Sequence, residues 1–212
     1  MQISPLQLEQ VNHQIQALRD AGSFYGKKLE EAGITGVSSV EDFENLPFSE
    51  KADLRDAYPL GLMTAPEEEI VRIHSSSGTT GLPVIIPYTR KDVDDWATMF
   101  ARCYEMAGIT NKDRIHITPG YGLWTAGIGF QAGAEKLGAM CIPMGPGNTD
   151  KQLQMMVDMK STVLCATSSY ALLLAEEIEK RGIKDKIHLK KGVIGSERWG
   201  DAMRKRISEE LG

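Results

Sequence analysis

The sequence predicts an α/β protein in which a mostly parallel sheet is flanked by helices, with a helical segment in front of it. After residue 113, short apolar and β-branched runs alternate with helical periodicities, and before residue 66 the patterns are those of short helices separated by glycines. The 212 residues are 42% hydrophobic and 25% charged, as in soluble globular proteins. We therefore expect a helical N-terminal segment over residues 1–65 and an α/β portion over residues 66–212.

Charge and cysteine content exclude several classes of function. A formal net charge of -5 argues against a nucleic-acid partner, which requires a basic face. Cys103, Cys141 and Cys165 are odd in number and far apart, so neither a zinc site nor a disulfide framework is expected. No apolar run approaches the roughly 18 residues of a membrane span, and the first residues do not resemble a signal peptide. These features predict a cytoplasmic protein that does not interact with membranes.

The N-terminal segment begins with a strong helix signal. Ser4 is a good N-cap and Pro5 suits the first helical position, and Gly22 ends the apolar periodicity that follows. The next helix is predicted over residues 24–32, and two shorter ones are predicted to begin near residues 39 and 49.

One stretch is organised around small hydroxylated residues and glycines, Ser75-Ser76-Ser77-Gly78-Thr79-Thr80-Gly81. Residues 70–74 before it and 83–88 after it have strand patterns. Glycines allow backbone N–H groups to turn inward and the hydroxyls add donors, so the loop can wrap an anion such as a triphosphate. A Walker A loop is disfavoured because Leu82 follows where that motif has lysine. A flexible linker is the alternative interpretation.

The α/β portion follows in order. Thr89 and Asp92 are spaced as a capping box that opens a helix, which Gly108 closes. Thr149 and Gln152 are spaced as a second one. Strands are predicted over residues 114–118, 139–143, 163–166 and 191–194, and helices over residues 125–137, 149–160, 169–181 and 201–211. Three glycines in the first of these helices predict that it packs closely against a sheet or a ligand: Gly127, Gly129 and Gly133.

Ligands of such folds bind at the carboxyl ends of the parallel strands. The loops expected there cover residues 119–124, 144–148, 167–168 and 195–199. Tyr121 and Trp124 lie beside glycines, which suits a pocket for a flat or apolar group, although both could instead plug the sheet edge. His116, on a strand that leads to this edge, is interpreted as structural.

These residues resemble a known family. Ser75 to Pro83 resembles the phosphate loop of adenylate-forming enzymes. The motifs around it are similar to those of phenylacetate-CoA ligases in particular: His74, Tyr88-Thr89, Trp96, Tyr121-Gly122-Leu123, Gly133-Ala134-Glu135, Ile142-Pro143-Met144 and Gly195-Ser196-Glu197. The resemblance runs almost end to end and implies the N-terminal half of such a ligase, that is, the N-terminal portion of the adenylate-forming ligase fold.

The resemblance implies a two-step reaction. An aryl carboxylate attacks the α-phosphorus of Mg²⁺-bound ATP and releases pyrophosphate, and the thiol of coenzyme A then attacks the acyl-adenylate. The phosphate loop would cradle the outer phosphates through Ser75, Ser76, Ser77, Gly78, Thr79, Thr80 and Gly81. Gly195, Ser196 and Glu197 match the adenine and acyl pocket. Tyr121, Gly122 and Trp124 match the wall around the aryl group.

The family motifs that hold magnesium, bind ribose and supply the catalytic lysine do not occur in these residues. We therefore expect no catalytic residue and no metal ligand here, and we expect the 212-residue chain alone to be inactive. Leu82 replaces a family lysine, and Pro119, Trp124 and Ser196 also depart from the family pattern, so another aryl or short-chain acid stays open. A non-catalytic nucleotide-binding module and an adenylating relative with a non-CoA acceptor are the alternatives. A homodimer is left open.

Overall fold

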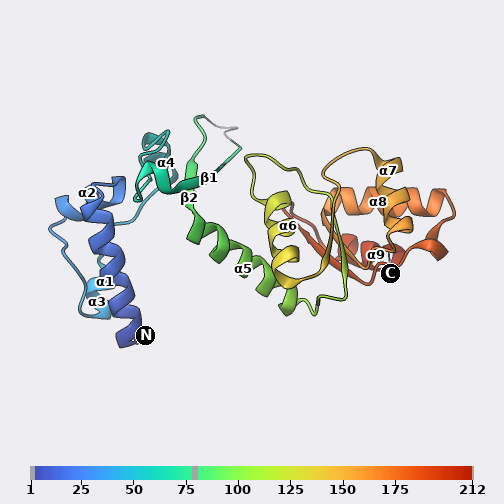
Figure 1. The fold of residues 1–212 in the computed structure, drawn as a ribbon, viewed down its shortest axis with the longest axis horizontal. Helices are drawn as coiled ribbons and strands as arrows, with labels where there is room; N and C mark the ends of the chain where they lie inside the picture. The colour runs from blue at the N-terminus through green and yellow to red at the C-terminus, as the bar shows by residue number, and fades with distance from the viewer. Residues whose placement is uncertain (1–2, 78–80, 212) are drawn as a thin grey trace. The chain divides into compact units, whose positions relative to one another are not determined.

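The computed structural model describes residues 3–77 and 81–211. The chain divides into two compact units, residues 1–93 and residues 94–212 (Figure 1). Each unit has its own hydrophobic core, formed in the first by helices and in the second by a sheet and the helices on it.

Four helices make up most of the first unit: α1 (Pro5–Asp20), α2 (Phe24–Glu31), α3 (Val40–Glu44) and α4 (Lys51–Asp56). The predicted start of α1 is confirmed, because the Ser4 side chain accepts from the Gln7 amide and the Gln7 side chain accepts from the Ser4 amide. Ser23 and Ser39 cap α2 and α3 in a related way. These caps satisfy amides that a helix start leaves without partners.

The core of the first unit is small. Ile15, Leu29 and Val37 are buried together. Asn12 ties the segment after α2 to α1, because its side chain donates to the Val37 carbonyl at 2.8 Å and accepts from the Val37 amide at 2.7 Å.

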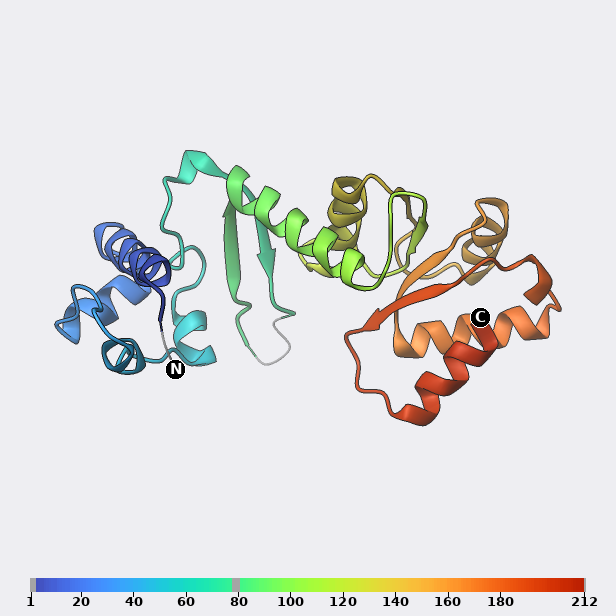
Figure 2. The ribbon, with the colours of Figure 1, turned by 90° about the horizontal axis from the view of Figure 1, so that it is seen from below.

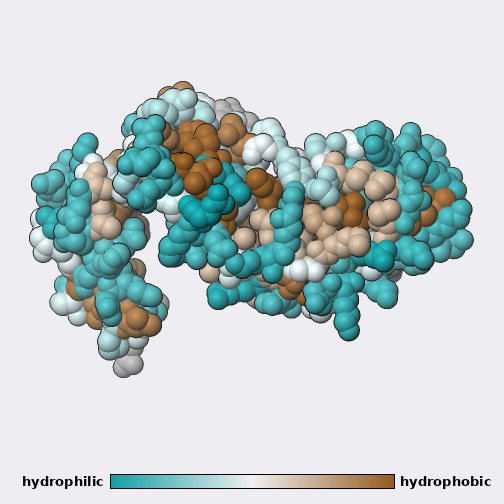
Figure 3. Space-filling model, viewed as in Figure 1, coloured by the Kyte–Doolittle hydropathy of each residue, from teal (hydrophilic) through white to brown (hydrophobic). Residues whose placement is uncertain are grey.

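A two-stranded antiparallel hairpin follows in the same unit, after a short 3-10 helix η1 (Glu67–Glu69). Strands β1 (Ile70–Ser75) and β2 (Ile85–Thr89) pair with Ser75 opposite Ile85 (Figure 2). The two strands predicted around the glycine-rich stretch are thus confirmed. Exposed Val71, Ile73 and Ile86 give the hairpin apolar surface, and Figure 3 shows hydrophobic colour over β1 and β2.

The second unit is built on a parallel four-stranded sheet with the order β4-β3-β5-β6. Its strands are β3 (Arg114–Ile117), β4 (Met140–Pro143), β5 (Val163–Thr167) and β6 (Lys191–Gly195). The helices are α5 (Arg90–Met106), whose first turn belongs to the first unit, α6 (Ala126–Leu137), α7 (Thr149–Asp158), α8 (Ser168–Lys180) and α9 (Asp201–Leu211), with a 3-10 turn η2 (Lys184–Lys186). The predicted α/β class is confirmed.

Both faces of this sheet are covered. Val163 and Cys165 of β5 pack with residues of α5 and α6, whereas Leu164 and Ala166 pack with residues of α7, α8 and α9. Successive residues of a strand point to opposite faces, so one strand serves both cores.

Helix α6 approaches α5 closely through two of its glycines, whereas the sequence predicted close packing against a sheet or a ligand. A Cβ atom at Gly129 would lie 2.4 Å from Cζ of Phe100, and one at Gly133 would lie 2.5 Å from Cβ of Phe100. Any larger side chain at these two positions would force the helices apart.

One predicted capping box is wrong, although the helix begins at the predicted residue. Thr149 and Gln152 do not form a capping box, because Asn148 is the N-cap of α7 and accepts from the Lys151 amide at 3.2 Å. Asn148 has a left-handed φ of 49°, which asparagine tolerates better than most residues. Gln152 is instead 1% exposed and faces the protein interior.

Candidate functional site

A cavity of about 300 Å³ lies at the carboxyl ends of β3 and β5 and beside the loop that follows β4. It is lined by Thr118, Pro119, Gly120, Pro146, Gly147, Thr167, Ser169 and Tyr170. Parallel strands bring their carboxyl ends to one edge of a sheet, where ligands of open α/β folds bind. The volume is at the lower end of the range for small-molecule sites.

The loop over residues 144–148 forms one wall of this cavity. The amides of Met144 and Gly145 both donate to the Ile117 carbonyl, at 3.1 and 3.0 Å, so the loop curls over the end of β3. Gly145 and Gly147 have φ values of 71° and 80°, in the left-handed region that glycine adopts without strain.

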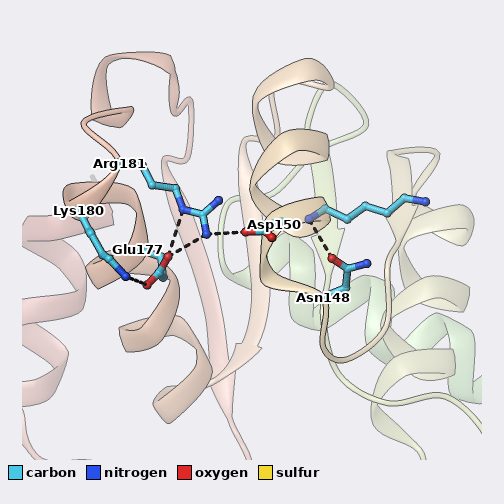
Figure 4. Close-up of polar contacts among 6 residues, drawn as sticks. Asn148, Asp150, Glu177, Lys180 and Arg181 are labelled. Carbon is cyan, nitrogen blue, oxygen red and sulfur yellow. Dashed lines mark hydrogen bonds and ion pairs between the residues drawn. The ribbon is translucent and has the colours of Figure 1, made fainter.

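An ion-pair group holds the start of α7 against α8 (Figure 4). Arg181 donates to Asp150 at 2.6 Å and to Glu177 at 2.8 Å. Hydrogen bonds from Arg181 hold the pKa of the Glu177 carboxyl below its usual value. The group is at the surface, so it contributes orientation more than stability.

The Glu197 carboxylate occupies the N-terminus of α8. It accepts from the Ser169 amide at 2.9 Å, the Ser169 hydroxyl at 2.9 Å and the Ser168 hydroxyl at 3.0 Å. The hydrogen bond from the Ser169 amide is the largest of the effects that lower the Glu197 pKa. A helix N-terminus favours an anion, and here the protein supplies its own. Because Ser169 lines the cavity, Glu197 fastens the loop after β6 to the cavity wall.

Three residues predicted to surround the aryl group do not line this cavity in the structure. The Tyr121 ring packs against the core between the sheet and α6, and burial raises the pKa of its phenol. Its Oη is buried without a hydrogen-bond partner among the described residues. Gly122 has a φ of 112°, and Trp124 is 55% exposed. The aryl-binding role of these residues stays a prediction.

The adenine and acyl assignment also stays a prediction. Gly195 ends β6, and Ser196 has a left-handed φ of 70°. Sequence reasoning missed Thr118 and Tyr170, which do line the cavity. Their position next to predicted strand ends was the available signal. Tyr170 was overlooked because its aromatic ring fits equally well into a helix core.

The glycine-rich stretch closes the hairpin between β1 and β2. The Ser76 amide donates to the Val84 carbonyl at 3.0 Å, and the Ser76 hydroxyl accepts from the Val84 amide at 2.9 Å. These bonds fix the base of the loop, and the Ser76 amide is already engaged in them. Ser77 and Gly81 are exposed, the latter with a φ of 138°. Gly78, Thr79 and Thr80 lie outside the described residues, so the phosphate cradle stays a prediction.

The thiols of Cys141 and Cys165 are unreactive. Burial raises the pKa of Cys141 to about 11 and that of Cys165 to about 12, so both are protonated at neutral pH and are poor nucleophiles. In the described part of the chain, no group of three His, Cys, Asp or Glu side chains is placed to hold a metal ion. None of the described helices is long and apolar enough to cross a membrane.

Along almost its whole length, the chain is similar in sequence to curated proteins of one group. No family model matches. Phenylacetate-coenzyme A ligase from Pseudomonas putida is 41% identical over 209 residues, which cover 97% of this chain and 48% of the relative. The enzyme of the same name from Escherichia coli (strain K12) is 40% identical and covers 100% of this chain and 49% of the relative. The chain thus spans about half the length of the curated relatives it matches.

Comparison with solved structures gives the same class. A 2-hydroxyisobutyryl-CoA ligase in complex with 2-HIB-AMP and CoA, in the thioesterification state, matches with a TM-score of 0.87 and 30% identity over 96% of this chain and 46% of that chain. A long-chain-fatty-acid-CoA ligase from Archaeoglobus fulgidus matches with a TM-score of 0.54 and 21% identity over 68% of this chain and 28% of that chain, which shows a shared fold.

The fold that the chain shares with solved CoA ligases therefore places it in the class of adenylate-forming ligases. Within that class, its sequence belongs to the phenylacetate-coenzyme A ligase family and corresponds to about half of such a protein, as the resemblance predicted.

Proposed function

We propose that the chain supplies the phosphate loop and the acyl-binding cavity of an AMP-forming aryl-CoA ligase. In the first step an aryl carboxylate attacks the α-phosphorus of ATP, which forms an acyl-adenylate and releases pyrophosphate. In the second step the coenzyme A thiol attacks the acyl carbon, which forms the thioester and releases AMP. The observation that carries the proposal is the identity of about 40% to phenylacetate-coenzyme A ligases along the whole chain.

The lining and the size of the cavity support this chemistry. Thr118, Thr167 and Tyr170 are among the residues that line a space of about 300 Å³. A single aryl ring with a carboxylate arm is small enough for a space of this size. Acyl-adenylate formation needs no protein nucleophile, so catalysis would rest on positioning and electrostatics.

The phosphate loop would act through backbone and hydroxyl donors aimed at the outer phosphates. Ser76 would hold the base of the hairpin rather than contact phosphate, because Val84 already binds its amide and its hydroxyl. Ser77 and Gly81, both exposed, would begin and end the part that faces the nucleotide.

The test is ATP–pyrophosphate exchange by the natural gene product at full length, measured over a panel of aryl acids and followed by thioester detection. Acid-dependent exchange together with a CoA thioester supports the proposal. Exchange with no thioester would indicate a relative with another acceptor. Nucleotide binding without exchange would indicate a non-catalytic module and would contradict the proposal.

A further inference from the structure

A buried polar network lies directly behind the cavity wall. His116 of β3, Gln152 of α7 and Ser161, which precedes β5, are 0%, 1% and 0% exposed. His116 Nε2 lies 2.7 Å from Gln152 Oε1, and His116 Nδ1 lies 3.3 Å from Ser161 Oγ. Burying polar groups is costly unless each is hydrogen-bonded, so the direction of every bond here matters.

The network ends on two carbonyls of the 144–148 loop. Gln152 Nε2 donates to the Gly145 carbonyl at 2.7 Å and to the Gly147 carbonyl at 3.1 Å. Since carbonyl oxygens only accept, the amide nitrogen must face the loop and Oε1 must face His116. His116 Nε2 then carries the hydrogen, and Nδ1 accepts from the Ser161 hydroxyl. The contacts alone therefore fix both the amide orientation and the histidine tautomer.

The clamped loop is also the cavity wall. Pro146 and Gly147 line the cavity, and the Gly147 carbonyl additionally accepts from the Tyr170 hydroxyl at 3.4 Å. Gly145, Gly147 and Asn148 have left-handed φ values. Backbone of this kind has other accessible conformations when glycine supplies it, so side-chain bonds decide which one is kept.

We propose that Gln152 is a positioning residue that sets the 144–148 loop, and with it one wall of the acid-binding cavity, and that His116 orients Gln152. Both donors and the acceptor of the Gln152 amide are used in this arrangement. The part of the inference that concerns acid binding rests on the proposed function. The part that concerns the loop rests on the contacts alone.

The first test reads out the loop without any activity. Gln152→Glu keeps the shape but removes at least one of the two donors to the carbonyls, because a carboxylate has no donor and a protonated carboxyl group has one. Gln154→Glu makes the same change at an exposed site on the same helix. We expect hydrogen exchange of the Met144 and Gly145 amides, relative to that of Leu164 in β5, to be about tenfold faster in Gln152→Glu than in Gln154→Glu. Equal ratios in the two variants overturn the proposal.

A measurement on the unchanged protein keeps the inference testable if Gln152→Glu does not fold. Nitrogen-15 chemical shifts of His116 at pH 7.5 should show a neutral ring with the hydrogen on Nε2. A neutral ring with the hydrogen on Nδ1 overturns the proposal, because Gln152 could then not face the loop with its nitrogen.

The second test uses the exchange reaction of the full-length gene product. Gln152→Glu should raise KM for the acid about tenfold while kcat changes less than KM, whereas Gln154→Glu should leave both unchanged. Matching KM values in the two variants overturn the acid-binding part. If the unaltered protein exchanges with none of the acids, the proposed function fails, and the hydrogen-exchange result still decides the role of Gln152 in the loop.

Discussion

Replacement of Gly127 by alanine should displace the loop that follows β3, which lines the cavity through Pro119 and Gly120. A Cβ atom at Gly127 would lie 2.5 Å from the Gly120 carbonyl oxygen and 2.9 Å from that of Pro119, against the 3.4–4 Å of ordinary contacts. The obstacle is backbone and cannot rotate away. The Gly127 amide also donates to the Gly120 carbonyl at 3.2 Å, a bond that the displacement would weaken.

The magnitude follows from opposed effects. Overpacking costs about 1–3 kcal/mol, and loss of the hydrogen bond costs about 1 kcal/mol. Alanine in place of glycine in a helix gains up to about 1 kcal/mol. We expect Gly127→Ala to lower the free energy of unfolding by about 1–3 kcal/mol in urea titrations.

Gly200→Ala is the matched control, because a Cβ atom there would meet no other atom within 4 Å. It should change stability by less than about 0.5 kcal/mol. A Gly127→Ala protein as stable as the unaltered chain would refute the close approach of α6 to the cavity loop.

Three further predictions concern His116, Glu197 and the activity of the 212-residue chain. Burial lowers the pKa of His116 below 6.5, and its described contacts with Gln152 and Ser161 are uncharged. As the pH falls below 6.5, the His116 side chain therefore binds a proton more readily in the unfolded state than in the folded state. The contribution of His116 to the free energy of unfolding should therefore be constant above pH 6.5. Below that pH, the free energy of unfolding measured in urea titrations should fall by up to about 1.4 kcal/mol per pH unit. The same fall with pH in a His116→Gln protein would show that His116 is not its cause. Glu197→Gln should lower the melting temperature more than Glu179→Gln, an exposed change on α8, because it replaces the carboxylate that caps this helix; equal melting temperatures would exclude the capping role. The 212-residue chain alone should form no acyl-CoA, and any ATP-dependent thioester detected by mass spectrometry would show that its residues suffice for catalysis.

The elements of the fold were predictable wherever local chemistry decides them. Ser4 with Pro5 sets the start of α1, and Thr89 with Asp92 opens α5, where Asp92 accepts from the Thr89 amide at 2.8 Å. The central strands β3 and β5 are buried on both faces and read as short apolar runs, so their strand character is visible without tertiary information.

The role of Gln152 was not predictable, because its spacing from Thr149 imitates a capping box. Asn148 displaces Thr149 as the N-cap, since asparagine both caps well and adopts a left-handed φ. One partner of Gln152, His116, is 36 residues away, and only the fold brings the two together.

The cavity was predictable in place but not in lining. The rule that ligands bind at the carboxyl ends of strands located it. Which side chains face it depends on the local backbone of each loop and helix start. Tyr121, in the loop after β3, packs against the core, whereas Tyr170, in the first turn of α8, lines the cavity. The hydrophobic periodicity of the sequence does not show which way such a side chain points.

ATP–pyrophosphate exchange by the full-length gene product, with phenylacetate and related aryl acids, tests the central claim most directly. Exchange that depends on an aryl acid and leads to its CoA thioester is the predicted result. Nucleotide binding without acid-dependent exchange would contradict the assignment of the chain to acid activation.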